Sequence, residues 1–343
     1  MSFLWYIVIF TIAIALIFDV INGFHDAANS IATVVSTRVL SPRFAVLWAA
    51  FFNFVAMFIF EPRVANTVSK IIKIDSIDPA FIYVVLAGIL GAIFWDLITW
   101  WWGLPTSSSH ALIGGLSGAG LAHKGLAIIN WDKLWKTVEY IPLAPIIGFA
   151  SGFVLMIIVY WIFRKWKPEN VDKVFRKGQL ISAALYSLGH GGNDAQKTMG
   201  VIVAVLVAAG IFNANTQLSL TDPKTLWIIL SCHAAMGVGT ALGGWKIVKT
   251  MGMKLTKLKP VHGFCAESAG AATLFLVTHL GIPISTTHTI AGSIIGVGST
   301  MHFSNIKWSI AMRIVVAWFV TIPASALVAS LSFYLIKLFH PGF

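Results

Sequence analysis

About ten stretches of mostly apolar residues, each close to the length that crosses a bilayer, dominate what this chain can fold into. They lie near residues 3–24, 43–60, 80–102, 104–128, 141–163, 179–212, 225–245, 261–280, 282–300 and 309–338. The mean hydropathy is +0.83, and 11% of the residues are charged, against roughly 25% in soluble domains. The sequence therefore predicts an all-α, multi-pass membrane protein, because only lipid can cover so much apolar surface.

The positive charges predict how the chain is oriented in its membrane. A net charge of +11 can indicate nucleic-acid binding, but cytoplasmic loops of membrane proteins carry the same excess of Lys and Arg. The basic segment 164–178 is expected to be the central cytoplasmic loop, and residues 246–259 form a second basic cluster. This alternation predicts a cell (inner) membrane protein with both termini outside and no nucleic-acid partner.

Two polar motifs occur once in each half of the chain and in the same order. Residues 23–29 read GFHDAAN and residues 191–197 read GGNDAQK. Residues 104–120, LPTSSSHALIGGLSGAG, likewise match residues 282–298, IPISTTHTIAGSIIGVG. Two long matches in the same order indicate an internal duplication.

The duplication is predicted to be inverted. A weaker match, of residues 64–67 with residues 247–250, lies between the two strong ones. Each half, 1–163 and 179–343, holds five predicted crossings, and an odd number inserts the second half upside down. Inverted repeats of this kind are common in secondary transporters, whose substrate sites lie near the midplane.

The polar motifs are also expected to break the membrane helices. Ionisable residues at membrane depth cost about 2.5–3.5 kcal/mol on insertion scales, so they indicate function. The glycines of GFHDAAN and GGNDAQK would allow unwound backbone, and Pro105 and Pro283 would open new helices. Half-helix N-termini offer N–H groups and a positive dipole end to an anion. The hydroxyl-rich turns after the prolines suit the oxygens of phosphate.

At these motifs the sequence resembles the PiT family of inorganic phosphate transporters. The resemblance rests on GFHDAANSIAT at residues 23–33, GHGGNDAQKTMG at residues 189–200 and the LPTSSSH and IPISTTH segments. It covers essentially the whole chain. It implies an all-helical inverted repeat that moves phosphate together with sodium ions or protons.

The resemblance also implies a set of substrate- and ion-binding residues. They are Asp26, Asn29, Ser107, Ser108, Ser109, Asn193, Asp194, Gln196, Lys197, Glu267, Ser285, Thr286 and Thr287. Sodium-coupled members of the family usually carry asparagine where this chain has Lys197, whereas proton-coupled bacterial members share its glutamine–lysine pair. An ammonium group at that position would take the place of a sodium ion. His25 and His190 are candidates for a proton relay.

Other polar residues have plainer interpretations. Cys232 and Cys265 lack metal-ligand spacing and are expected to be small buried apolar side chains, so no metal site and no cofactor are predicted. His110 and its counterpart His288 are expected to pack or to hydrogen-bond in the protein interior. Asp19 and Asp96 are left open between a functional and a structural role.

The sequence as a whole predicts a secondary active transporter that imports inorganic phosphate by proton symport. The substrate form suggested by the resemblance is a neutral complex of phosphate with a divalent metal. Alternatives are sodium coupling, sulfate or another oxyanion on the same scaffold, and an anion channel. Enzymatic activity is not expected, because neighbouring helix residues such as Ser109 and His110 cannot face each other. The expected partners are phosphate, protons, the lipid bilayer and further copies of the chain.

Overall fold

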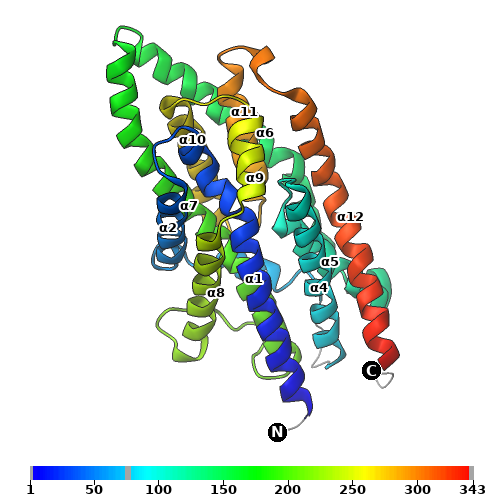
Figure 1. Ribbon diagram of the computed structural model, residues 1–343. Coiled ribbons are helices and arrows are strands. Elements are labelled where there is room, and N and C mark those ends of the chain that lie inside the picture. Colours follow the sequence, from blue (N-terminus) through cyan, green and yellow to red (C-terminus); the bar gives the residue numbers. More distant parts are fainter. Residues whose placement is uncertain (1–2, 74–78, 340–343) are drawn as a thin grey trace.

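The computed structural model describes residues 3–73 and 79–339, and that part of the chain is built from helices (Figure 1). The first half contains α1 (Phe3–Ser36), α2 (Pro42–Val55), α3 (Arg63–Val68), α4 (Ala80–Trp102), α5 (Ser108–Lys124) and α6 (Trp131–Phe163). The second half contains α7 (Pro168–Ala208), α8 (Pro223–Leu242), α9 (Trp245–Lys249), α10 (Pro260–His279), α11 (Thr286–Ser299) and α12 (Trp308–Phe339). The shorter helical turns are η1 (Ala56–Phe58), η2 (Gly125–Ile128), the π-helical η3 (Thr250–Lys254) and η4 (Phe303–Asn305).

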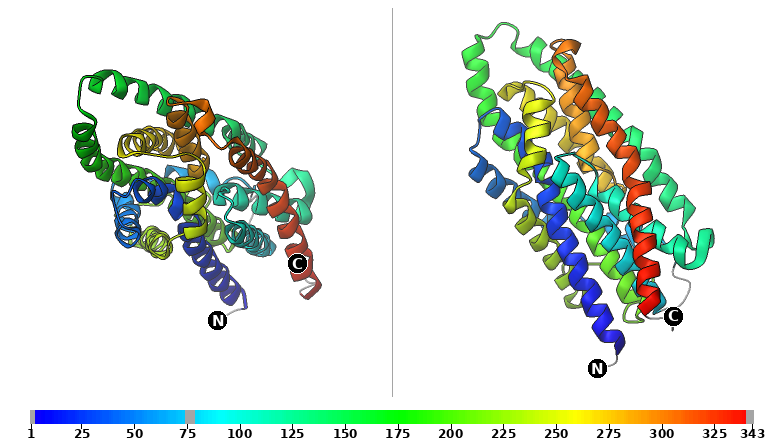
Figure 2. Two further views of the ribbon diagram at one scale, coloured as in Figure 1. Left: turned by 45° about the horizontal axis from the view of Figure 1, so that its top comes forward. Right: turned by 45° about the vertical axis from the view of Figure 1, so that its right-hand side comes forward.

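The two halves repeat the same order of long and short helices, so that α1–α6 correspond to α7–α12. Their mutual contacts are mirrored as well: α5 packs along α12, while its counterpart α11 packs along α6. Both chain termini lie at one end of the molecule, and the connection between α6 and α7 lies at the other (Figures 1 and 2). The predicted all-helical fold is confirmed, and the mirrored contacts agree with the predicted repeat, whose inversion stays a prediction.

Glycines hold the short helices α5 and α11 against their partners, as expected from the small residues in these segments. A Cβ added at Gly114 or Gly118 of α5 would lie 2.3 or 2.2 Å from atoms of α12. A Cβ at Gly292 or Gly296 of α11 would lie 2.2 or 2.1 Å from backbone oxygens of α6. Such close approach of backbones requires glycine. It fixes the N-terminal tips of α5 and α11 in the middle of the molecule.

Matching hydrogen bonds fasten the short helical segments of each half to the loop that precedes α5 or α11. The hydroxyl of Thr67 in α3 donates to the carbonyl of Gly281 at 2.7 Å, and that of Thr250 in η3 donates to the carbonyl of Gly103 at 2.9 Å. Both glycines have left-handed backbone, with φ of 69° and 65° respectively, where α10 and α4 end. We call these contacts the α3 latch and the α9 latch.

A basic side chain reinforces each latch at an equivalent position. Arg63 donates to the carbonyl of His279 at 3.0 Å, and Lys246 donates to the carbonyl of Trp101 at 3.2 Å. The repeat relates the two latches, so they lie on opposite sides of the molecular centre. Both sets of hydrogen bonds are formed, and the polar residues of the molecular centre are buried.

Each latch can be loosened without touching the other. Replacing Thr67 by valine removes the hydrogen bond to Gly281, which stabilises the closed α3 latch by about 1 kcal/mol. The latch should therefore open roughly fivefold more often. We expect amide hydrogen exchange to accelerate by that factor at residues 279–285 and to stay unchanged at residues 101–107. Replacing Thr250 by valine should give the reverse pattern, so each variant is the control of the other. Equal acceleration in both segments would contradict two independent latches.

The count of ten complete crossings is not confirmed. In the described part of the chain, six helices are long and apolar enough to cross a membrane, namely α1, α4, α6, α8, α10 and α12. Helices α2, α5 and α11 have 14, 17 and 14 residues. They rise only about 21–26 Å, short of the hydrocarbon thickness of about 30 Å. Helix α7 has 41 residues, but its central turns are polar.

The expectation that GFHDAAN and GGNDAQK interrupt their helices is wrong, since α1 and α7 run through these motifs without a break. The breaks lie instead between α4 and α5, between α10 and α11, and beside α3 and α9. The motif glycines serve packing rather than unwinding. A Cβ on Gly23 or on its counterpart Gly191 would lie 2.5 Å from the backbone oxygen of Met236 or of Asn53.

The segment 164–178, expected to be a loop, is mostly helical. Only residues 164–167 form a turn, because α7 begins at Pro168, and proline is favoured in a first helical turn. An ion pair of 3.1 Å between Arg176 and Asp172, four residues apart, supports this extension. The turn and the basic residues that follow α9 lie at the same end of the molecule, opposite the termini (Figure 1).

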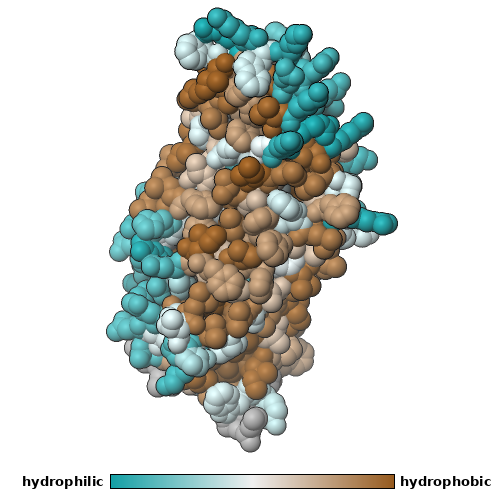
Figure 3. Space-filling model, turned by 90° about the vertical axis from the view of Figure 1, so that its left-hand side faces the viewer, coloured by the Kyte–Doolittle hydropathy of each residue, from teal (hydrophilic) through white to brown (hydrophobic). Residues whose placement is uncertain are grey.

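The outer surface is apolar between its two ends. Hydrophobic side chains cover most of the middle of the face in Figure 3, and hydrophilic ones gather at its upper end and along one lower edge. The exposed large apolar residues include Phe44, Phe51, Ile146, Ile162, Leu185, Phe319, Leu327 and Leu331. Exposed apolar side chains in such number fit contact with lipid tails.

Candidate substrate and ion site

The polar motifs of the two halves meet where α1 and α7 cross in antiparallel directions. The buried polar side chains along this line are Asp19, Asn22, Asp26, Asn29 and Thr33 of α1 and Gln179, Ser182, His190, Asp194, Lys197 and Thr198 of α7. Those of α1 recur every three or four residues, which places them on one helix face. At one end of the line, Thr37 donates to Gln179 at 2.8 Å. In the middle, Asp26 lies close to His190 and Asp194.

Lys197 is the cation of this centre, and its ammonium group is held by three oxygens. It donates to a carboxylate oxygen of Asp194 and to the hydroxyl of Ser109 at the tip of α5. Its third bond, of 2.9 Å, goes to the backbone carbonyl of Ile284, just before α11. An ammonium has three donors and no acceptor, so its hydrogen-bonding capacity is filled. Lys197 therefore ties α7 to both tips at once.

Asn29 occupies the equivalent position in the first half and makes the equivalent contact. Its amide nitrogen donates to the hydroxyl of Thr287 at 2.9 Å, just as Lys197 donates to Ser109 in the other half. The amide oxygen of Asn29 is buried and has no hydrogen-bond partner. The repeat thus places a neutral amide on one side of the centre and a fixed cation on the other.

Each motif aspartate is paired with a histidine. Nδ1 of His25 lies 2.7 Å from Oδ1 of Asp26, and Nε2 of His190 lies 3.2 Å from Oδ2 of Asp194. Potential metal-ligand atoms of Asp26, His190 and Asp194 all lie within 4.8 Å of one another. The motifs taken singly predict no metal site, and this group was not foreseen because its members come from both halves of the chain. One imidazole and two carboxylates are donors that divalent cations accept.

The six hydroxyls of the two turns have different roles. The hydroxyls of Ser107 and Ser285 cap α5 and α11. Each accepts a hydrogen bond from the backbone N–H three residues later in the chain, at 3.2 and 3.1 Å respectively. Thr286 donates to Asp194 at 3.0 Å. The hydroxyl of Ser108 is buried without a hydrogen-bond partner. Four of the six hydroxyls are therefore free of the capping role and lie at the helix N-termini that face the centre.

The two histidines of these turns pack together, as expected for buried, non-catalytic imidazoles. The rings of His110 and His288 meet edge to face with centroids 4.7 Å apart, and His288 also stacks on Trp318 at 4.0 Å. Their contact joins α5 to α11 behind the hydroxyl turns. Cys232 and Cys265 are both free and buried, as expected.

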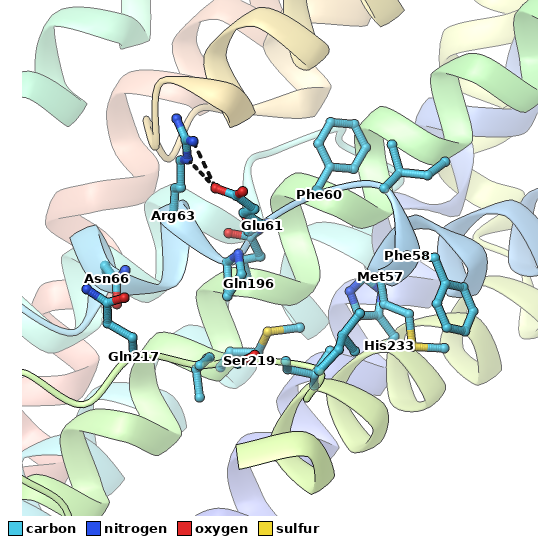
Figure 4. Close-up of a pocket in the computed structure, with 16 residues that line it drawn as sticks. Met57, Phe58, Phe60, Glu61, Arg63, Asn66, Gln196, Gln217, Ser219 and His233 are labelled. Atoms are coloured by element: carbon cyan, nitrogen blue, oxygen red, sulfur yellow. Dashed lines mark hydrogen bonds and ion pairs between the residues drawn. The ribbon is translucent and has the colours of Figure 1, made fainter. Parts of the chain in front are cut away.

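Gln196 lies apart from the central cluster. Its side-chain oxygen accepts from the backbone N–H of Val64 at 2.8 Å, and its nitrogen donates to the carbonyl of Glu61 at 3.0 Å. It therefore supports the start of α3. It also lines a pocket of about 630 Å³ with Arg63 and His233 (Figure 4). This position follows from α3, which the sequence did not reveal as a separate helix.

Glu267 and Asn193 lie beside the line rather than at its centre. The carboxylate of Glu267 accepts from Thr33 at 2.5 Å and from Ser182 at 2.5 Å, and so joins α10 to α1 and α7. The amide of Asn193 donates to the carbonyl of Ile282 at 3.2 Å. Sequence reasoning missed Thr33 and Ser182, although their helical spacing from the motif residues could have indicated them.

The sequence is similar to known proteins over nearly its whole length. The profile of the phosphate transporter family matches residues 22–329. The chain is 52% identical, over 94% of both chains, to a probable low-affinity inorganic phosphate transporter of Rhizobium meliloti (strain 1021). It is 43% identical to one of Bacillus subtilis (strain 168), over 98% of this chain and 99% of that one. The chain belongs to the phosphate transporter family.

The fold agrees with this membership. A solved structure described as "The sodium-dependent phosphate transporter" superposes with a TM-score of 0.85 and 25% identity, covering 97% of this chain and 99% of that one. Transport rather than catalysis is the role of the family, so the expectation of a non-enzymatic, multi-pass membrane protein is confirmed. This phosphate transporter shares its helix arrangement with that structure.

Proposed function

We propose that this phosphate transporter binds inorganic phosphate between the tips of α5 and α11 and imports it by alternating access. The observation that carries this proposal is the convergence of two helix N-termini, their hydroxyls and a fixed ammonium on one buried centre. N–H groups, hydroxyls and a cation are the donors that phosphate oxygens need. Because the central residues are buried, substrate can enter only when the structure opens, and in this proposal the two latches are the contacts that open in turn.

Protons are the coupling ion in this proposal. The three oxygens around Lys197 are a carboxylate, a hydroxyl and a carbonyl, which are the ligand types that a sodium ion would also use. The tethered ammonium fills that position and moves with the protein instead of crossing the membrane. A proton gradient is then left to supply the driving force.

The proposal also covers the form of the substrate and the orientation of the protein in its membrane. Phosphate with a divalent metal carries no net charge, and Asp26, His190 and Asp194 offer donors for the metal of such a complex. The basic end of the molecule would face the cytoplasm, which leaves both termini outside an inner membrane. Assembly with further copies of the chain stays a prediction.

Competition binding tests the substrate assignment against sulfate. We expect unlabelled phosphate to displace labelled phosphate from the purified protein at least about tenfold better than sulfate, or about 1.4 kcal/mol. Hydrogen phosphate has an O–H that a carboxylate such as Asp26 can accept, and sulfate has none at neutral pH. Equal displacement by the two anions would favour a general oxyanion transporter.

The hydroxyl turns provide a second test of the binding site. Replacing Ser107, Ser108 and Ser109 together by alanine should weaken phosphate binding by several kcal/mol at most, given about 0.5–1.5 kcal/mol per hydrogen bond. Changing Ser285, Thr286 and Thr287 to alanine should have a similar effect. Ser107→Ala alone is the control, because it removes only a helix cap. Weakening by one triple variant and not by the other would contradict a symmetric site.

A further inference from the structure

Asp19 is a buried carboxyl group that the proposed phosphate site does not use. It lies on α1 seven residues before Asp26, which is about 10 Å nearer to the end that carries the termini. Its exposed fraction is 0%, and in the described part of the chain neither of its carboxyl oxygens has a hydrogen bond of ordinary geometry, although Asn22 and Thr198 lie beside it. Burial of this kind disfavours the charged form of a carboxyl group.

Two further orphan oxygens lie beside this carboxyl group. Asn22 of α1 and Thr198 of α7 are its side-chain neighbours, and Oδ1 of Asn22 and Oγ1 of Thr198 are also buried without a partner. A protonated Asp19 has one donor and an acceptor oxygen. Its O–H can donate to Asn22 while its other oxygen accepts from the hydroxyl of Thr198. The proton therefore supplies the donor that the amide oxygen of Asn22 lacks, while Thr198 can donate to the other carboxyl oxygen.

Charged groups nearby do not remove the need for that proton. The other titratable groups that face Asp19 are Asp194 and Lys197 of α7 and Cys232 of α8. The ammonium of Lys197 already donates all three of its hydrogens elsewhere. The carboxylate of Asp194 is negative and repels a charged Asp19.

The arrangement occurs in one half only. The repeat pairs Asp19 with Ser187, whose hydroxyl donates to the carbonyl of Ala183 at 2.8 Å. Asp96 is also a buried carboxyl group without a hydrogen-bond partner, but it faces His25 and Ser108 beside the hydroxyl turn. Asp96 thus belongs to the substrate site, whereas Asp19 stands apart from it.

We propose that Asp19, with Asn22 and Thr198, is the site that binds the coupling proton. This inference rests on the proposed proton symport and names its carrier. The proton enters from the end that carries the termini and binds the carboxylate of Asp19 as an O–H. It removes one negative charge from the neighbourhood of Asp194 and of the incoming anion, so proton and phosphate favour each other's binding.

The test compares two activities of the protein in proteoliposomes, using labelled inorganic phosphate. The first is accumulation driven by an imposed pH gradient, and the second is exchange of labelled for unlabelled phosphate at equal pH. Asp19→Asn keeps the shape and fixes the uncharged state. We expect its driven accumulation to fall at least tenfold, while its exchange stays within about threefold of the wild type. Asp19→Glu restores the carboxyl group and should restore accumulation.

The outcomes separate this inference from the proposed function. Accumulation by Asp19→Asn at the wild-type level, or loss of exchange together with accumulation at normal membrane abundance, would overturn the assignment of Asp19 alone. A wild-type protein that ignores the pH gradient would overturn proton symport and the inference with it. Should Asp19→Asn fail to insert, Thr198→Val decides by the same two readouts. It should lower accumulation several-fold and leave exchange intact, and an unchanged accumulation would count against the site.

Discussion

Replacing Asp194 by asparagine is expected to lower phosphate uptake at least about 100-fold, which corresponds to about 2.7 kcal/mol. The carboxylate of Asp194 binds the ammonium of Lys197, lies beside His190 and accepts from Thr286. Its loss leaves the ammonium of Lys197 without its counter-charge in a buried place, and breaking such a pair costs about 3–5 kcal/mol. Uptake of labelled phosphate into proteoliposomes, at matched protein content, measures the effect.

A double variant separates instability from loss of function. Asp194→Asn combined with Lys197→Met removes both charges, so thermal stability should return toward the wild-type value while uptake stays absent. Asp26→Asn should also abolish uptake, with the smaller stability loss expected for a carboxylate whose one hydrogen bond in the described structure is to His25. Near-normal uptake by either single variant would show that its carboxylate is structural.

Lys197→Asn is expected to abolish uptake driven by a pH gradient and to introduce a weak dependence on sodium. Asparagine stands at the equivalent position of the first half, so this change makes the two sides of the centre alike. The oxygens of Asp194, Ser109 and Ile284 would lose their tethered cation and become available to a mobile one. Uptake measured with separate sodium and pH gradients reports both changes.

Lys197→Met provides the matched control for this variant. Methionine has a similar length but brings no oxygen ligand, so uptake should be lost without any response to sodium. Wild-type behaviour of Lys197→Asn under a pH gradient would contradict the role assigned to the ammonium. The comparison thus distinguishes a missing charge from a new ion site.

The sequence predicted the helical class, and it aligned Asp26 with Asp194, which the structure brings close together. Duplicated motifs can be aligned without a structure. It misplaced the helix breaks. Gly23 and Gly191 have the composition of an unwound segment, yet both lie in continuous helix where a neighbouring backbone approaches closely. Sequence alone cannot distinguish a glycine needed for backbone freedom from one needed for close packing.

The centre of the site was predictable in part. The motif residues Asn29, Asp194 and Lys197 converge as expected, since helical spacing puts them on facing stripes. The position of Gln196 was not predictable, because it depends on α3, a six-residue helix with little periodicity. The hydrogen bond from Lys197 to the backbone carbonyl of Ile284 was also not predictable, because every residue has a backbone carbonyl and the side-chain pattern does not show which one is used.

In the proposed mechanism, Lys197 replaces a mobile sodium ion and leaves the coupling to protons. This mechanism is tested most directly by wild-type uptake of labelled phosphate into proteoliposomes, with sodium replaced by choline at constant pH and membrane potential. A separate arm imposes an acidic exterior in the absence of sodium. We expect unchanged uptake on choline replacement and stimulation of uptake by the pH gradient. A several-fold fall in uptake when sodium is removed, with no response to the pH gradient, would contradict it.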